Sequence, residues 1–268
     1  MLLKERMVNN GRTGVEPPEV RPLVPTHAEL IRALWEHKRS GRWGRAFRQP
    51  HRVLLNRLGY SVERQWQEEF VSYAGWPKNV RARLGCLPDN FITGASLKPD
   101  IACRLYELVR DTHCEKIVEC GSGISTIIIA LAIGDRSITF VSLEESEHWL
   151  EITKRALMAF DVLDRVQLVY SPLTPIEFNG KRIKAHDDSA IANGNADVLL
   201  VDAPPAKVGR MGVLPRMTKH LRPGALVLLD DAVRGGEEEC VRAWVDNGLA
   251  NLEGYLALGT GMAVLKTK

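Results

Sequence analysis

One short stretch constrains this chain more than any other, because an apolar run, two glycines and a second apolar run follow one another without a break. The sequence Ile117-Val118-Glu119-Cys120-Gly121-Ser122-Gly123-Ile124-Ser125-Thr126 predicts a buried strand, a tight turn and the start of a helix. Glycine lets the backbone turn where a side chain would clash, and the first turn of a helix has free N–H groups. The stretch therefore predicts a turn that binds a small polar ligand.

After Pro99, short β-rich runs alternate with helical stretches, which is typical of βαβ units around a mostly parallel sheet. The predicted strands are Lys116–Cys120, Ile138–Leu143, Val166–Tyr170, Asp197–Val201, Ala225–Leu229, Tyr255–Leu258 and Met262–Leu265. The predicted helices are Asp100–Asp111, Ser125–Ile133, Ser146–Phe160, Arg210–His220 and Gly236–Asn247. Only Gly259-Thr260-Gly261 separates the last two strands, a loop too short for a crossover. We therefore predict an α/β fold with a doubly wound, seven-stranded sheet, mostly parallel and closed by a C-terminal antiparallel hairpin.

The N-terminal third differs from this pattern. Residues 1–25 contain four prolines and show no helical or strand period, which predicts a flexible arm. Residues 26–95 show the helical spacing of apolar residues, as at Leu30, Ile31 and Leu34, and are predicted to form a helical cap. Residues 96–268 then form the ligand-binding domain.

Composition excludes several classes of protein. The longest apolar run, Ile127–Gly134, is too short to span a bilayer, and no apolar stretch follows the charged N-terminal residues, so no membrane partner is expected. The five cysteines form no CxxC pair and are odd in number, which favours a reducing cytoplasm over a disulfide framework. The net charge of +3 is small for 268 residues, so charge alone does not indicate a nucleic-acid partner.

Two acids narrow the choice of ligand at the glycine turn. Glu144 follows the second predicted strand, where a carboxylate can accept hydrogen bonds from both hydroxyls of a ribose, although acids are also favoured at a helix N-terminus. A dinucleotide favours a third glycine, but Thr126 occupies that position. Glu119 would repel a pyrophosphate, whereas it suits a cationic amino-acid group. The turn therefore favours S-adenosylmethionine over NAD.

These residues resemble a known family. The stretch from Val118 to Thr126, Glu144, the run Val198–Asp202 and the run Leu221–Asp231 are similar to class I S-adenosylmethionine-dependent methyltransferases, and within them to bacterial small-molecule O-methyltransferases. The similarity runs from about Ser96 to Lys268. The resemblance implies that Glu119 and Gly121–Gly123 surround the methionine part, Glu144 holds the ribose and the turn after the third strand covers the adenine. The residues it implies for cofactor binding are Ser96, Glu119, Gly121, Ser122, Gly123, Ser125, Thr126, Glu144, Ser171, Pro172, Leu173 and Asp202. The family often has an acid in that third turn, where this chain has Ser171-Pro172-Leu173.

Three further acids follow two strands that the resemblance makes neighbours. Asp202 follows the run Val198–Val201, and Asp230 and Asp231 follow Ala225–Leu229, so their carboxylates are expected to meet at one edge of the sheet. Three oxygen ligands suit Mg²⁺, which would lower the pKa of a substrate hydroxyl. The alternative is that Asp202 only contacts the cofactor or shapes the turn before Pro204, while Asp230 and Asp231 cap the next segment.

The catalytic residues follow from the same cluster. Asp202 and Asp231 are candidates for orienting the acceptor or taking its proton, and Lys207, five residues after Asp202, is a candidate base that is otherwise a surface lysine. His186 lies in a polar stretch predicted to be a loop, where a lone histidine usually faces solvent.

A basic segment with interleaved aromatic residues supports an alternative function. The basic residues are Arg32, Lys38, Arg39, Arg42, Arg45, Arg48, Arg52 and Arg57, and the aromatic ones are Trp35, Trp43 and Phe47. Such a segment can bind phosphates and single-stranded bases, which would suit RNA modification, or it can cover the catalytic domain or a second subunit. The favoured prediction is methyl transfer to a small-molecule acceptor, most simply at a hydroxyl. The alternatives are an RNA-modifying methyltransferase and an inactive cofactor-binding module. A helical N-terminal cap often mediates dimers in enzymes of this kind, so a homodimer is compatible with the resemblance.

Overall fold

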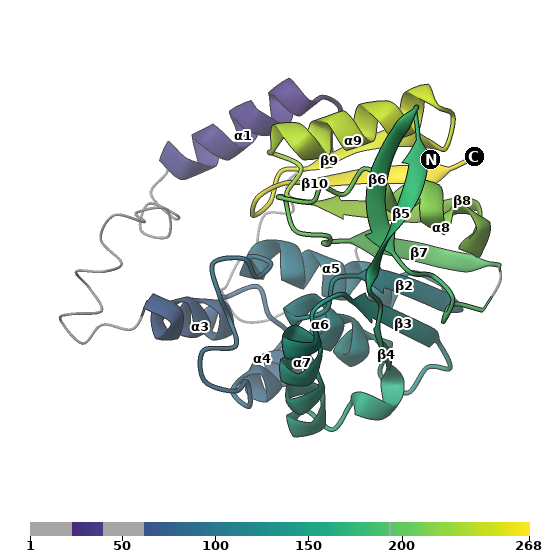
Figure 1. Cartoon of the computed structure of the whole chain (residues 1–268). Coiled ribbons are helices and arrows are strands. Elements are labelled where there is room, and N and C mark those ends of the chain that lie inside the picture. Colours follow the sequence, from purple (N-terminus) through teal and green to yellow (C-terminus); the bar gives the residue numbers. More distant parts are fainter. Residues whose placement is uncertain (1–22, 40–61, 193) are drawn as a thin grey trace.

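The computed structural model describes residues 23–39, 62–192 and 194–268, and it confirms the α/β fold with a large, mostly parallel sheet (Figure 1). The order of strands is β1-β9-β10-β8-β7-β2-β3-β4. Their bounds are β1 Leu23–Val24, β2 Lys116–Cys120, β3 Thr139–Glu144, β4 Gln167–Tyr170, β7 Ala196–Val201, β8 Leu221–Asp230, β9 Ala250–Leu256 and β10 Met262–Thr267. Strands β4, β3, β2, β7 and β8 run parallel, and β10 pairs antiparallel with both β8 and β9. The C-terminal hairpin is thus confirmed.

The sheet has one strand more than predicted. Leu23 and Val24 form β1 and pair with Leu256 and Tyr255 of β9, so the last residues of the predicted arm 1–25 belong to the sheet. Residue 254 of β9 is a glycine, and a Cβ built there would lie only 2.7 Å from Leu23 Cγ. The prediction of an arm without structure is therefore wrong at residues 23 and 24, because two residues suffice to pair with an exposed strand edge. Residues 1–22 of the arm lie outside the described residues.

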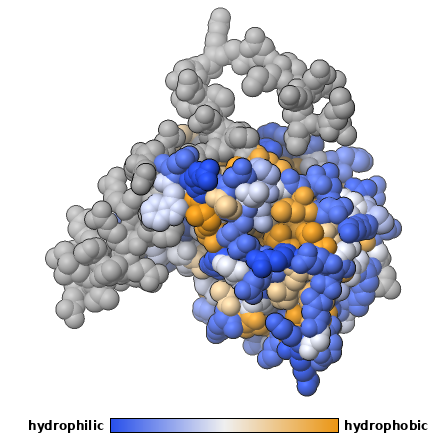
Figure 2. Space-filling model, turned by 90° about the horizontal axis from the view of Figure 1, so that it is seen from above, coloured by the Kyte–Doolittle hydropathy of each residue, from blue (hydrophilic) through white to orange (hydrophobic). Residues whose placement is uncertain are grey.

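Helices cover both faces of the sheet, because strand residues alternate between two hydrophobic clusters. One cluster joins Ile117 and Phe140 to the helices α5, α6 and α7, and the other joins Val118 and Val141 to α8 and α9. The bounds are α5 Pro99–Asp111, α6 Ile124–Ile133, α7 Glu147–Ala159, α8 Val213–Met217 and α9 Gly235–Asp246. Some apolar side chains remain at the surface, where Figure 2 shows hydrophobic patches between hydrophilic residues. None of the described helices is long and apolar enough to cross a membrane.

The helices of the predicted cap lie on different faces of the sheet. Helix α1 (His27–Arg39) places Leu30 in the cluster of α8 and α9, while α3 (Val62–Ser72) and α4 (Lys78–Leu84) pack on the cluster of α5 (Figure 1). Most of the basic aromatic segment between Arg32 and Arg57 lies outside the described residues. Within the described part, Trp35 is 58% exposed.

A hairpin lies between the third and fourth predicted strands, where no helix or strand was predicted. Strand β5 (Leu173–Phe178) pairs antiparallel with β6 (Lys181–His186) in a separate two-stranded sheet. The linking residues Asn179 and Gly180 have φ of +52° and +68°, which suits a two-residue hairpin turn. Neither β5 nor β6 was predicted, although Asn-Gly between two alternating runs is a strong hairpin signal.

The helix predicted over Arg210–His220 is much shorter than expected. Helix α8 spans only Val213–Met217, and a 3-10 turn, Thr218–His220, leads into β8. Pro215 lies in the first turn of α8, where its missing N–H is tolerated. A helix that began at Arg210 would have placed this proline in its interior.

Candidate functional site

The turn between β2 and α6 packs directly against the turn that follows β7. Gly121 has φ of +97°, and a Cβ built there would lie 2.7 Å from Ala203 Cβ. The carbonyl of Cys120 accepts hydrogen bonds from the N–H groups of Asp202 and Ala203, at 2.9 and 2.8 Å. Position 121 therefore requires glycine, and the two turns form one surface at the carboxyl edge of the sheet. Beside Gly123, at the start of α6, no described atom lies within 4 Å of a Cβ position, so the backbone there is open to a ligand.

Glu119 lies beneath this turn and faces the interior. Its side chain is fully buried, and Oε2 accepts hydrogen bonds from Thr126 Oγ1 and Ser142 Oγ, each at 2.6 Å. Oε1 has no partner among the described residues. Burial raises the pKa of Glu119 to about 7, against hydrogen bonds from Ser125, Ser142 and Thr126 that favour the charged carboxylate. Glu119 thus ties β2, β3 and α6 together under the turn.

This buried carboxyl group predicts a pH-dependent stability. The pKa of Glu119 is about 7 in the folded protein against an ordinary 4.5, so its contribution to stability is complete below about pH 4.5 and is lost as the pH rises through about 7. Between about pH 5.5 and about pH 8.5, the wild type should lose about 2 kcal/mol of unfolding free energy that Glu119→Gln keeps. Glutamine still accepts from Thr126 and Ser142. Urea unfolding at both pH values measures the difference, with the exposed Glu177→Gln on β5 as the control. Equal pH dependence in wild type and Glu119→Gln would contradict the assignment.

Glu144 ends β3 beside the glycine turn. Its Oε2 accepts hydrogen bonds from the N–H and the hydroxyl of Ser122, both at 2.8 Å, and Oε1 accepts one from the N–H of Ser146 at 2.9 Å. The residue is 4% exposed, and burial raises its pKa against these hydrogen bonds. Each carboxylate oxygen can accept two hydrogen bonds, so Oε1 keeps the capacity to accept one more. Ser146 in turn caps α7.

The turn after β4 is joined to the hairpin. Ser171 is buried, its N–H donates to the Glu144 carbonyl at 2.8 Å, and its hydroxyl donates to the Asp187 carbonyl at 2.7 Å. The N–H of Asp187 donates to the Pro172 carbonyl at 2.9 Å, and Leu173 is the first residue of β5. The turn itself carries no acid, but Asp187 stands directly across from Pro172.

Ser96, the first residue of the predicted cofactor set, lies before α5 on the same chain segment as Lys98. Its hydroxyl accepts a hydrogen bond from the N–H of Thr93 at 3.0 Å, and its own N–H donates to the Thr93 carbonyl. No described contact joins Ser96 to the glycine turn.

The three aspartates after β7 and β8 come together as predicted from the sequence. One carboxylate oxygen from each of Asp202, Asp230 and Asp231 lies within 4.8 Å of the other two. Asp231 has φ of +59°, a conformation that is uncommon outside glycine. Asp230 is 2% exposed, and its Oδ1 has no hydrogen-bond partner among the described residues. Burial raises the pKa of Asp202 to about 6 and that of Asp230 well above its usual range. Repulsion from Asp231 adds to both increases, and the positive charge of Arg210 opposes them.

An arginine that the sequence analysis missed lies inside this acid cluster. The side chain of Arg210 is 3% exposed, and its Nη2 is 3.0 Å from Asp202 Oδ1 and 3.2 Å from Asp231 Oδ2. The guanidinium group also donates to the carbonyls of Asp202, Pro204 and Asp230. Nothing in the sequence distinguishes Arg210 from a surface arginine, because its burial follows from the packing of two distant turns.

Lys207, the candidate base, and a second lysine, Lys98, differ in their relation to the acid cluster. Lys207 is exposed on the turn after β7, and no hydrogen bond or ion pair of its side chain is found in the described ranges. Lys98, at the start of α5, is half-buried instead. Burial lowers the pKa of Lys98, against the opposing effects of Asp231 and Asp230. Lys98, which immediately precedes α5, is therefore the lysine that interacts electrostatically with Asp230 and Asp231.

His186 is buried, so the expectation of a solvent-facing loop histidine is wrong. It ends β6, is fully buried, and its Nε2 lies 3.0 Å from Glu145 Oε2. The β5–β6 hairpin, which was not predicted, brings this histidine into contact with Glu145, the residue after Glu144.

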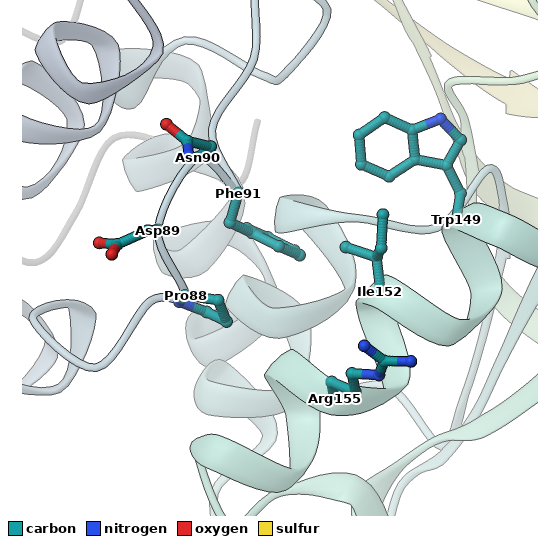
Figure 3. A pocket seen from close by; sticks show the side chains of 7 residues that line it. All are labelled: Pro88, Asp89, Asn90, Phe91, Trp149, Ile152 and Arg155. Carbon is teal, nitrogen blue, oxygen red and sulfur yellow. The ribbon is translucent and has the colours of Figure 1, made fainter. Parts of the chain in front are cut away.

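A cavity of about 320 Å³ lies between α7 and the segment before α5 (Figure 3). Phe91 and the indole of Trp149 face it from opposite sides, and Ile152 and Arg155 line it from α7. The backbone N–H of Trp149 donates to Ser146 Oγ at 3.3 Å. The cavity therefore opens within one helical turn of the residue that hydrogen-bonds to Glu144.

The mostly parallel sheet, with the glycine turn after β2 and acids after β3, β7 and β8, has the fold of known methyltransferase structures. Residues 118–232 match the protein family described as a methyltransferase domain. No curated protein matches the chain.

Solved structures share this fold at low sequence identity. A methyltransferase from Geobacter sulfurreducens is 20% identical, with 72% of this chain and 90% of that chain covered and a TM-score of 0.53. An O-methyltransferase from Bacillus cereus, in complex with S-adenosylhomocysteine, is 15% identical, with 77% and 100% covered and a TM-score of 0.53. An O-methyltransferase from Streptomyces achromogenes, involved in tomaymycin synthesis and in complex with S-adenosylmethionine, is 16% identical, with 78% and 99% covered and a TM-score of 0.51.

Proposed function

We propose that this protein transfers the methyl group of S-adenosylmethionine to a hydroxyl group of a small-molecule acceptor. The observation that carries the proposal is the acid cluster beside the glycine turn, because Asp202 follows β7 and donates its N–H to Cys120 directly before Gly121. Acceptor activation and cofactor binding would therefore occur at one edge of the sheet. Two of the structural neighbours are O-methyltransferases, which supports oxygen as the acceptor atom. We place the reaction in the cytoplasm, since all five cysteines are free.

In this proposal the glycine turn and Glu144 hold the cofactor. The methionine part would lie over Gly121–Gly123, where the backbone at Gly123 is open and α6 begins with free N–H groups. The ribose hydroxyls would donate to Glu144, which is already oriented by Ser122 and Ser146. The main contribution of the protein would be to hold the acceptor oxygen in line with the sulfonium methyl, because methyl transfer is a single displacement that needs no covalent intermediate on the protein.

The acid cluster also fits a divalent cation. Three carboxylates converge, and Asp230 Oδ1 is buried without a partner, which is costly unless a cation or proton neutralises it. Asp202, Asp230 and Asp231 would supply the oxygen ligands that Mg²⁺ prefers. When bound, the metal would lower the pKa of the acceptor hydroxyl. The aspartates themselves orient the acceptor oxygen, and Asp202 or Asp231 accepts its proton if no metal is required.

The cofactor assignment predicts selective binding. S-adenosylhomocysteine should bind the full chain with a Kd of about 1–100 μM, while NAD should bind at least about 100-fold more weakly, because the third glycine that favours a pyrophosphate is missing. Isothermal titration calorimetry with both ligands measures this. Tighter binding of NAD than of S-adenosylhomocysteine would overturn the proposed function. Transfer of a radiolabelled methyl group to a panel of phenols and sugars then identifies an acceptor.

The ribose assignment predicts the effect of one substitution. Glu144→Ala should weaken S-adenosylhomocysteine binding by about 1–3 kcal/mol, because the ribose hydroxyls would lose their acceptor. Glu147→Ala is the matched control, since Glu147 is the exposed acid in the first turn of α7. An unchanged affinity in Glu144→Ala would show that this acid only organises the turn through Ser122 and Ser146.

A further inference from the structure

Arg210 joins the two turns that carry the acid cluster. Nη2 donates to the carbonyl of Asp202 after β7, and Nη1 donates to the carbonyl of Asp230 at the end of β8 at 2.8 Å. Nε donates to the Pro204 carbonyl at 3.3 Å. All three guanidinium nitrogens are therefore used, and the main chains of both acid-bearing turns are fixed to one planar group.

The same guanidinium also orients two of the three carboxylates. Nη2 lies 3.0 Å from Asp202 Oδ1 and 3.2 Å from Asp231 Oδ2, but no contact reaches the carboxylate of Asp230. Asp230 Oδ1 consequently remains the buried oxygen without a partner in the cluster. Arg210 thus holds two ligand groups in place and leaves the third one open.

Stability alone is a poor explanation for this arrangement. Burying an arginine among several acids has a desolvation cost that the ion pairs only partly offset, and apolar residues of similar size often serve as well. A further acid, Glu237, has its Oε1 3.8 Å from Arg210 Nε. At the rim of the cluster, Nη1 of the half-exposed Arg234 lies 2.8 Å from Asp231 Oδ2. The network has the features of an outer shell that orients the ligands of an ion.

We infer that Arg210 is a positioning residue that holds Asp202 and Asp231 in the geometry needed to bind a divalent cation together with Asp230. The inference rests on the proposed function, because it assigns a role within the metal-assisted form of that reaction. Lysine cannot replace Arg210, since its single ammonium group cannot reach acceptors on two turns at once. The fork of donors, and not the positive charge alone, is therefore the required property.

The test measures Mn²⁺ binding to the full chain with S-adenosylhomocysteine bound, by electron paramagnetic resonance of free Mn²⁺. Arg210→Lys should weaken Mn²⁺ binding about 10- to 100-fold, the usual cost of losing a residue that orients metal ligands. Its Kd for S-adenosylhomocysteine should stay within about threefold of the wild type, because the hydrogen bonds of Arg210 go to the turns after β7 and β8 and none reaches Glu144 or Gly121–Gly123. The Tm of each variant is measured in parallel.

Arg216→Lys is the matched control. Arg216 is also largely buried, and its contacts lie away from the acid cluster. Its Nη1 lies 3.6 Å from Asp188 Oδ1, and its Nη2 donates to the Pro175 carbonyl at 2.7 Å. It should bind Mn²⁺ as the wild type does. If Arg210→Lys does not fold, Arg210→Gln, which keeps a planar donor without the charge, takes its place.

The outcomes separate this inference from the proposed function. Equal Mn²⁺ affinity in wild type and in a folded Arg210 variant would overturn the positioning role and leave metal assistance intact. A wild type that binds S-adenosylhomocysteine but no Mn²⁺ would overturn both the metal role and this inference, while methyl transfer itself would stand. Weaker Mn²⁺ binding with unchanged cofactor affinity supports the inference.

Discussion

Replacement of Asp230 by asparagine is expected to lower kcat at least about 100-fold while changing the Kd for S-adenosylhomocysteine less than about threefold. Asp230 Oδ1 is buried without a hydrogen-bond partner among the described residues, and Asp230 lies at the end of β8, whereas Glu144 and the glycine turn are proposed to hold the cofactor. A group that acts on the acceptor lowers kcat without weakening cofactor binding. Asp246→Asn, at the exposed end of α9, is the control and should leave both values unchanged.

Chelation provides the companion measurement for Asp230. EDTA should abolish turnover of the wild type and Mg²⁺ should restore it. Arg210 and Arg234 pair with Asp202 and Asp231, but Asp230 Oδ1 is buried without a partner among the described residues and is the oxygen that a metal ion would neutralise. Full activity in EDTA would remove the metal from the mechanism. Activity of Asp230→Asn equal to that of the wild type would remove Asp230 itself.

Gly121→Ala is expected to abolish detectable cofactor binding and to lower the free energy of unfolding by about 2–4 kcal/mol. Its φ of +97° disfavours any side chain, and the new Cβ would lie 2.7 Å from Ala203 Cβ and 3.0 Å from Ala203 N. The turn after β7 would have to move away from the turn after β2, and Asp202 would move with it. Urea unfolding and calorimetry with S-adenosylhomocysteine measure the two effects.

Gly134→Ala separates the clash from the backbone strain. Gly134 ends the same helix, α6, with φ of +59°, and a Cβ there would meet no described atom within 4 Å. It should therefore show only the cost of an alanine in a backbone conformation that favours glycine, about 1–3 kcal/mol, with unchanged cofactor binding. If Gly121→Ala behaved like Gly134→Ala in both measurements, the close approach of the two turns would have no role in the site.

Local patterns in the sequence were sufficient for most of the sheet. The predicted span Lys116–Cys120 is the observed strand β2, and Met262 begins both the predicted last strand and β10. These elements are buried on both faces or end at glycines, so apolar runs and turn residues define them directly. The meeting of Asp202 with Asp230 and Asp231 followed for the same reason, because parallel neighbouring strands end at one edge.

The sequence by itself therefore determined the class of fold, the glycine turn and the residues that surround it, since each depends on contacts between neighbours in the chain. Tertiary structure alone decided the rest. Arg210 enters the acid cluster, and Lys98 approaches it, because distant turns pack together, and burial of a long polar side chain leaves no local pattern. Leu23 and Val24 became a strand because β9 offered an unpaired edge. Long-range packing, which no period of 2 or 3.6 residues encodes, fixed the charge and the final geometry of the site.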